Sequence, residues 1–163
     1  MLAVSALVAG CGGGSGVPVS APVSGADTAA ICGRMQQALP KQVDSADRRK
    51  TTPRTDRTAA WGDPPVILRC GVDRPAGLTA TSMLDTVNGI DWFIVNQPGG
   101  GHVFTTVGRA AYVEVTVPAA HDPQVGPLVD LAPAMEQVPP RPELYPHDVA
   151  TPSPTKKAAK PKR

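Results

Sequence analysis

Residues 83–95 read MLDTVNGIDWFIV, and the Asn88-Gly89 pair at their centre separates two runs of strand-forming residues. Both residues of this pair tolerate the positive φ angles that the tight turns of β-hairpins require. After the turn, every second residue from Ile90 to Ile94 is large and apolar. This alternation is typical of a strand with one face in a core. The stretch therefore predicts an antiparallel hairpin packed on one side.

Three further strands are expected on either side of this hairpin. Residues 66–72 form a β-branched run preceded by two prolines. Residues 102–107 and 111–117 flank Gly108-Arg109, whose Gly-X form predicts a tight turn. In the last strand, apolar residues at odd positions should point inward and Tyr112, Glu114 and Thr116 outward.

One predicted helix precedes these strands in the sequence, and another follows them. Asp27 is a candidate N-cap for a helix over residues 28–39, which Pro40 would end. A second helix could begin near Asp122, and Pro127 and Pro133 within it predict that it is short. Its expected apolar face is Leu128, Leu131, Ala132 and Met135.

The order helix, strand, two hairpins, helix predicts an α+β domain. We expect an antiparallel sheet of four to five strands, with the N-terminal helix and the short C-terminal helix on one face. Residues 41–58 are polar and charged without any period, which indicates a surface loop. Its basic cluster is a candidate contact site, although a solvated loop is the preferred interpretation.

The chain opens with an apolar run over residues 2–9, followed by Gly10 and Cys11. Val8, two small residues and the cysteine resemble the lipobox of bacterial lipoproteins, where the thiol receives a lipid. The run is too short to span a bilayer. No Lys or Arg precedes it, so we expect residues 1–11 to be a truncated lipoprotein signal that starts upstream. The alternatives are a cleaved signal without lipid and an accidental apolar start in a cytosolic protein.

This interpretation divides the chain into four parts. Residues 12–26 are rich in Gly, Ser and Pro and predict a flexible tether. Residues 27–138 predict a single domain, and residues 139–163 a disordered tail rich in Pro and Lys. A lipid on Cys11 would anchor the protein to the outer face of the cell membrane, with palmitate among the expected acyl groups.

The net charge of +2 conceals an asymmetry between body and tail. The last eight residues hold five of the sixteen Lys and Arg residues and no acid, so the rest carries −3. Nucleic-acid-binding domains instead spread positive charge over a folded face. We therefore expect a membrane, an envelope protein or a wall polymer as the partner, and no nucleic acid.

Once Cys11 is assigned to lipid, Cys32 and Cys70 remain. In an oxidising compartment an even number of cysteines favours one disulfide bond. The alternative is two separate buried thiols.

Candidate chemistry is sparse. The three histidines lack metal-ligand spacing, and we expect no metal, no cofactor and no catalytic residue. An acid–base pair for glycan cleavage is a weaker alternative. It would be drawn from Asp63, Asp91, Glu114, His102 and His121.

Four residues are candidates for contact with a ligand or partner. Trp61 and Trp92 would be stacking platforms if exposed, and core residues otherwise. Arg69 and Arg109 could pair with an acidic residue, Asp63 or Glu114, or could contact an anionic ligand.

Several motifs resemble one known family. They are Ala38-Leu39-Pro40 after the helical cysteine, Ala60-Trp61-Gly62, LRCGV at 68–72, VNGIDW at 87–92, Gly108-Arg109, and the strand ending in Pro118. Over residues 27–138 the chain resembles an actinobacterial envelope family catalogued as domain of unknown function 3515. The resemblance implies a small exported lipoprotein and brings no known activity.

The sequence thus predicts a non-enzymatic binding or accessory module at the cell envelope. The alternative is an exported hydrolase that acts on cell-wall polymers. A subunit of a membrane complex is a third interpretation.

Overall fold

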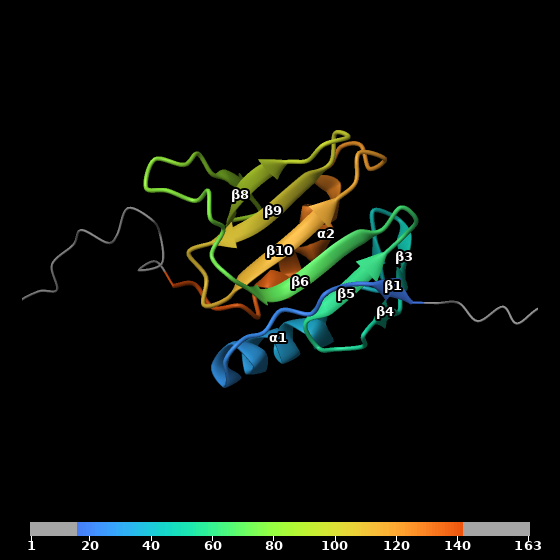
Figure 1. The fold of residues 1–163 in the computed structure, drawn as a ribbon, viewed down its shortest axis with the longest axis horizontal. Helices are drawn as coiled ribbons and strands as arrows, with labels where there is room; N and C mark the ends of the chain where they lie inside the picture. Colours follow the sequence, from blue (N-terminus) through green and yellow to red (C-terminus); the bar gives the residue numbers. More distant parts are fainter. Residues whose placement is uncertain (1–15, 142–163) are drawn as a thin grey trace, which may run out of the picture.

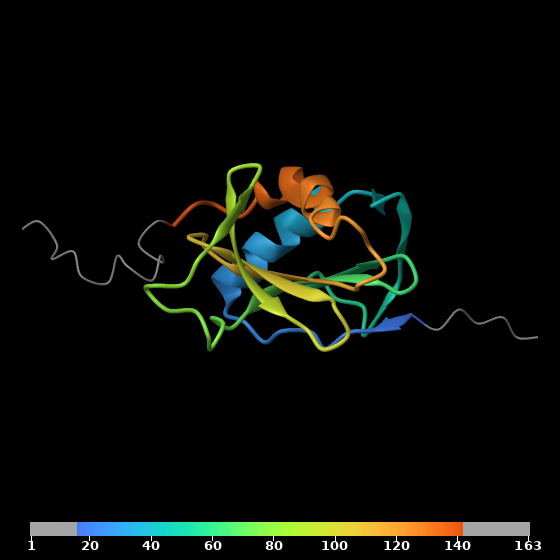
Figure 2. The same cartoon turned by 90° about the horizontal axis from the view of Figure 1, so that it is seen from above.

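The computed structural model describes residues 16–141, which form one layered α+β domain (Figure 1). Its main sheet has eight strands in the order β2-β3-β5-β6-β10-β9-β8-β7, and every neighbouring pair is antiparallel. The strands are β2 (Gln42–Val43), β3 (Ala46–Arg49), β5 (Thr58–Trp61), β6 (Val66–Val72), β7 (Asp85–Val87), β8 (Ile90–Asn96), β9 (His102–Val107) and β10 (Tyr112–Val117). Helices α1 (Ala26–Ala38) and α2 (Gly126–Met135) both lie on one face of the sheet (Figure 2).

The predicted α+β class and the two helices on one face are confirmed, but the expected four to five strands are too few. Strands β2, β3 and β5 occupy residues 42–61, most of which were expected to form a surface loop or a turn. Strand β3 contains three charged residues because it lies near the sheet edge, where side chains reach water on both faces. All four residues of β5 are buried, so this strand shows no apolar–polar alternation either.

The predicted hairpin and its neighbours are confirmed. Asn88 and Gly89 form the turn with φ angles of 49° and 74°. Ile90 and Trp92 of β8 are buried against the helices, as their alternation indicated. Strands β6 and β9 have the predicted bounds, whereas the link between β9 and β10 is four residues long instead of a tight two-residue turn.

Both helices are present, but the cap of α1 differs from the prediction, and α2 begins at Gly126 instead of near Asp122. The N-cap of α1 is Gly25, so Asp27 lies in the first turn and does not cap the helix. A carboxylate there still interacts favourably with the positive end of the helix dipole. In α2, Pro127 occupies the first turn, where no backbone N–H is needed, and the helix ends two residues after Pro133.

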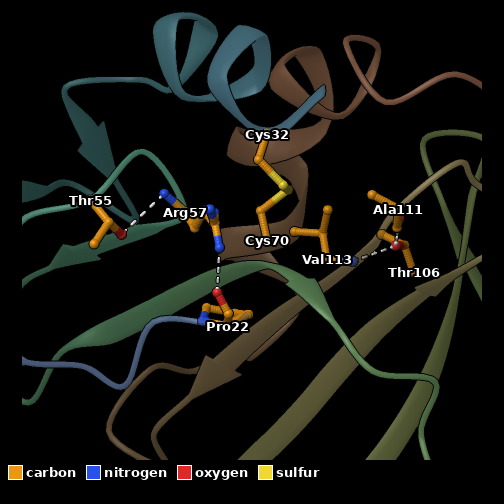
Figure 3. Close-up of a disulfide and its surroundings, with 8 residues drawn as sticks. All are labelled: Pro22, Cys32, Thr55, Arg57, Cys70, Thr106, Ala111 and Val113. Carbon is orange, nitrogen blue, oxygen red and sulfur yellow. Dashed lines mark hydrogen bonds between the residues drawn. A yellow bond between two sulfur atoms is a disulfide. The ribbon is translucent and has the colours of Figure 1, made fainter. Parts of the chain in front are cut away.

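The core lies between the sheet and the two helices. Cys32 and Met35 of α1 and the apolar stripe of α2 pack on the inward residues of β6 and β10. Cys32 points from α1 toward the sheet and forms a disulfide with Cys70 of β6 (Figure 3). The predicted disulfide is therefore present in the structure, and it links one helix directly to a central strand.

The stretch expected to be a flexible tether is ordered against the sheet from residue 16 onward. Strand β1 (Val17–Pro18) pairs in parallel with β4 (Thr51–Thr52). Val17 and Val19 are buried on the sheet face opposite the helices, against Ala60. Two apolar side chains and a partner strand fix this segment, so the folded part begins about ten residues earlier than we expected.

The folded part also ends slightly later than predicted. Pro139 accepts a hydrogen bond from the Ala110 N–H at 2.8 Å, and the Arg141 N–H donates to the Gly108 carbonyl at 2.7 Å. The rest of the predicted tail, residues 142–163, lies outside the described residues, as do the predicted signal and Cys11. Among the described helices, none is long and apolar enough to cross a membrane.

Replacing both bridging cysteines, Cys32→Ala with Cys70→Ala, should lower the free energy of unfolding. The disulfide closes a loop with a sequence separation of 38. For a loop of that length the chain-entropy model gives about 4 kcal/mol. Urea unfolding of the variant and of the wild type, each with and without a thiol reductant, measures the difference. An unfolding midpoint equal to that of the oxidised wild type would contradict the expectation.

Candidate functional site

A pocket with a volume of about 460 Å³ lies between α1 and the segment of residues 48–59. Figure 1 shows the loop after β4 running toward α1 before the chain enters β5. Four cationic side chains and one carboxylate line it, together with Gln36 and a group of threonines. The charged lining residues are Arg48, Arg49, Lys50, Arg54 and Asp56.

Two of these arginines, Arg48 and Arg49, lie on strand β3 and contact residues at the end of β5 and in the turn after it. The Arg48 guanidinium lies 5.7 Å from the centre of the Trp61 ring, an arrangement that favours a cation. Partial desolvation lowers the pKa of Arg48 from its ordinary value. Arg49 donates a hydrogen bond to the Gly62 carbonyl at 2.9 Å and lies 3.7 Å from the exposed Asp63 carboxylate. An arginine remains charged under such perturbations, so the pocket is electropositive.

The hydroxyl groups of threonine residues form the inner wall of the pocket. Thr58 is 2% exposed, and its Oγ1 lies 3.0 Å from Oγ1 of Thr51 and 3.2 Å from Oγ1 of Thr55. Thr55 also accepts a hydrogen bond from the Arg57 N–H at 3.2 Å (Figure 3). These contacts hold three hydroxyl groups side by side, and each hydroxyl can act as both a donor and an acceptor.

Gln36 completes the pocket from the α1 side. Its Nε2 donates to the Thr58 carbonyl at 3.3 Å, which joins α1 to β5. Its Oε1 is buried and has no hydrogen-bond partner in the described structure. A buried acceptor without a partner is uncommon in native proteins. The pocket therefore offers cationic donors and hydroxyl groups, whereas Oε1 of Gln36 is buried beneath its surface.

Of the two interpretations given for Trp61 and Trp92, the structure supports core residues over stacking platforms, because both side chains are 0% exposed. The Trp61 indole N–H donates to the Pro40 carbonyl at 3.1 Å. Trp92 packs edge to face against Phe104, with ring centres 6.4 Å apart. Both therefore act as core residues. Trp61 still affects the pocket indirectly, through Arg48 above it.

Arg69 and Arg109 contact neighbours within the fold. Arg69 pairs with Glu114, its cross-strand neighbour on β10, at 3.0 Å, which is one of the pairings we expected. Arg109 donates to the carbonyls of Met135 and Val138 at 3.2 and 2.9 Å, at the end of α2. It therefore satisfies backbone acceptors at a helix C-terminus. Neither arginine lines the pocket.

The five candidates for a hydrolytic acid–base pair each contact a residue outside that set. Their partners are Arg49 for Asp63, Thr86 for Asp91, Arg69 for Glu114, Gln124 for His102 and Asp44 for His121. These contacts give no dyad among the five. Within residues 16–141, moreover, no group of three His, Cys, Asp or Glu residues could hold a metal ion.

His121 and Asp44 form a histidine–carboxylate pair that we did not predict. His121 Nδ1 lies 2.6 Å from the Asp44 carboxylate, and Nε2 lies 3.2 Å from the Pro64 carbonyl. The Asp44 N–H in turn donates to Asp130 of α2 at 2.7 Å. Both ring nitrogens are thus occupied in joining the β2–β3 turn, the β5–β6 turn and the segment before α2. The pair has a structural role.

The comparisons with known proteins identify a family and no activity. A family model described as "Protein of unknown function (DUF3515)" matches residues 3–143, which include every pocket residue. No curated protein and no solved structure matches the chain.

Tryptophan fluorescence distinguishes core residues from stacking platforms. Because both indoles are fully buried, we expect blue-shifted emission and slow quenching by acrylamide in the folded chain. Both properties should change together on unfolding in urea. Rapid quenching in the folded chain, or a shift of emission on adding a soluble sugar, would contradict the buried positions.

Proposed function

Because the chain belongs to the DUF3515 family of proteins of unknown function, its activity must be inferred from its own residues, and we propose that it is a non-enzymatic binding module for an anionic ligand. The ligand binds in the pocket between α1 and residues 48–59. The observation that carries this proposal is the charge of the lining, four cationic side chains against one carboxylate.

Physical chemistry supports an anion in this pocket. Hydrogen bonds from arginine to phosphate or carboxylate are charge-assisted and can be bidentate. The volume of about 460 Å³ falls within the range of small-molecule sites, roughly 300–1,000 Å³. The lining includes no histidine and no cysteine. These features suit binding better than acid–base or nucleophilic chemistry, so the exported hydrolase remains the weaker proposal.

The proposal also places the module outside the cytoplasm, held by a lipid on Cys11 at the outer face of the cell membrane. Two features support this location. The sequence Val8-Ala9-Gly10-Cys11 has the form of a lipobox. The Cys32–Cys70 disulfide is typical of proteins in oxidising compartments. In this position the ligand would be an envelope component or a partner protein.

Binding of inorganic phosphate, measured by isothermal titration calorimetry at low ionic strength, tests the anion site. Arg48→Ala and Arg54→Ala should each weaken binding by about tenfold, because a hydrogen bond to a charged group contributes about 1.5–3 kcal/mol. Arg74→Ala is the matched control, since Arg74 is exposed and does not line the pocket. Equal weakening by all three variants, or no binding by the wild type, would overturn the proposal.

Mass spectrometry of the protein purified from the membranes of its host tests the anchor. We expect an N-terminal peptide that begins at Cys11 and carries added diacylglyceryl and acyl mass. Cys11→Ala should move the protein from the membrane fraction to the soluble fraction. An unmodified thiol at this position would contradict the anchor without affecting the pocket.

A further inference from the structure

We infer that the basic pocket and its rim form a docking surface for the anionic phospholipid headgroups of the membrane in which the proposed anchor is inserted. This inference rests on the proposed function, and it identifies the anion as the phosphate of a lipid headgroup. Two observations that coincide in space carry it. They are a group of exposed cations on the rim and the entry of the N-terminal segment beside them.

Three of the four cationic side chains that line the pocket are exposed to solvent, namely Arg48, Lys50 and Arg54. Among residues 16–141, Lys50 and Arg54 form no ion pair with an acidic residue. These three like charges lie within seven positions of the sequence, so they repel one another when no counter-charge is near. An anionic surface in contact with the rim would therefore lower the free energy of this arrangement.

The exposed cations come from three successive segments of the rim. Arg48 belongs to β3, Lys50 lies between β3 and β4, and Arg54 lies in the loop after β4. Charges distributed in this way suit a surface that carries many phosphates, because each cation can contact a different headgroup. Basic clusters of this kind are attracted to anionic membranes, with each Lys or Arg adding to the affinity.

The N-terminal segment enters the fold at this same rim. The Val17 N–H donates to the Lys50 carbonyl at 2.8 Å. A Cβ atom on Gly16 would lie 2.5 Å from Oγ1 of Thr52, so the segment packs tightly against the rim. Cys11 precedes Gly16 by only five positions. The proposed lipid would therefore hold the cations near headgroups at a high effective concentration, which favours contacts that are individually weak.

The basic tail at residues 156–163 is a separate group of charges. The two ends of the described chain lie on opposite sides of the domain (Figure 1). One end pairs with β4 beside the rim, and at the other end the Arg141 N–H donates to the Gly108 carbonyl. Substitutions in the rim and in the tail therefore test two different candidates for contact with an anionic membrane.

Sedimentation with vesicles at low ionic strength tests the docking surface on the full-length chain. The chain carries Cys11→Ala, so that no lipid anchors it, and Gln at all five basic positions of the last eight residues. We expect binding to vesicles of phosphatidylglycerol mixed with phosphatidylcholine, and none to phosphatidylcholine alone. Added salt should weaken this binding, because it screens exposed charges.

Single substitutions in this background locate the contact. Lys50→Gln and Arg54→Gln should each weaken binding about fivefold, the contribution of one basic residue near an anionic surface. Asp56→Asn should strengthen it by about the same factor, because Asp56 is the acidic residue of the lining and is exposed. Arg74→Gln is the matched control, since Arg74 is exposed outside the pocket, and it should change binding by less than about twofold.

A fluorescent label shows which side of the domain meets the vesicle. Thr52→Cys and Thr81→Cys are each labelled with nitrobenzoxadiazole, whose emission shifts to the blue near a bilayer. Both positions are exposed, and the segment that contains Thr81 lies on the side of the domain away from β4 (Figure 1). We expect a blue shift at position 52 and none at position 81. Equal shifts at both positions would mean that the domain has no defined docking surface and would overturn the inference.

The outcomes separate this inference from the proposed function. If the chain binds inorganic phosphate in calorimetry but not the mixed vesicles, the docking surface is wrong and the anion site stands. If it binds neither, the proposed function fails as well. Binding that Lys50→Gln and Arg54→Gln leave unchanged, with thermal melting showing that both variants are folded, would place the membrane contact elsewhere. Tighter binding of soluble polyphosphate than of vesicles would assign the pocket to an anionic polymer and overturn the inference.

Discussion

The burial of one sheet face beneath two short helices is the contact on which the rest of this domain depends. Alternate residues of the central strands β6 and β10 point into this layer, and α1 and α2 cover them. The Cys32–Cys70 disulfide adds a covalent link across it, from α1 to β6. With α1 fixed in this way, Gln36, one turn after Cys32, is held against β5 and the pocket has a rigid wall.

Period-two patterns located the centre of the sheet from the sequence. Strands β8 and β10 follow such patterns because one of their faces is more buried than the other. Strand β6 was located instead by its β-branched run, and β9, whose last four residues are all buried, by the turn that follows it. Strands β2 and β3 lie at or near the edge of the sheet, and β5 is buried throughout, so none of the three alternates. Strand β1 was not predicted, for a different reason. Its partner β4 lies more than thirty residues away, and only tertiary pairing makes it a strand.

The pocket could be predicted only in part. The basic run from Arg48 to Arg54 was visible in the sequence as a candidate contact site. The inner wall of the pocket could not be predicted. Gln36 has no distinguishing feature in the sequence, and only the folded chain brings it next to Thr58, 22 positions later. The two tryptophans were candidate contact residues because large side chains are rare in this chain. Because only 4% of the residues are aromatic, the two buried indole rings supply a large share of the aromatic area of the core.

Under the proposed lipid anchor on Cys11, the pairing of β1 with β4 limits how far the pocket can stand from the bilayer. Val17 lies opposite Thr51, which lines the pocket, and only six residue steps separate Val17 from Cys11. Even a fully extended chain covers at most about 22 Å over that length. With the proposed lipid on Cys11, Val17 would therefore remain within that distance of the headgroup layer, and the pocket lined by Thr51 would stay close to it. A domain held so closely would sample ligands at the membrane surface and could not search the outer layers of a thick wall.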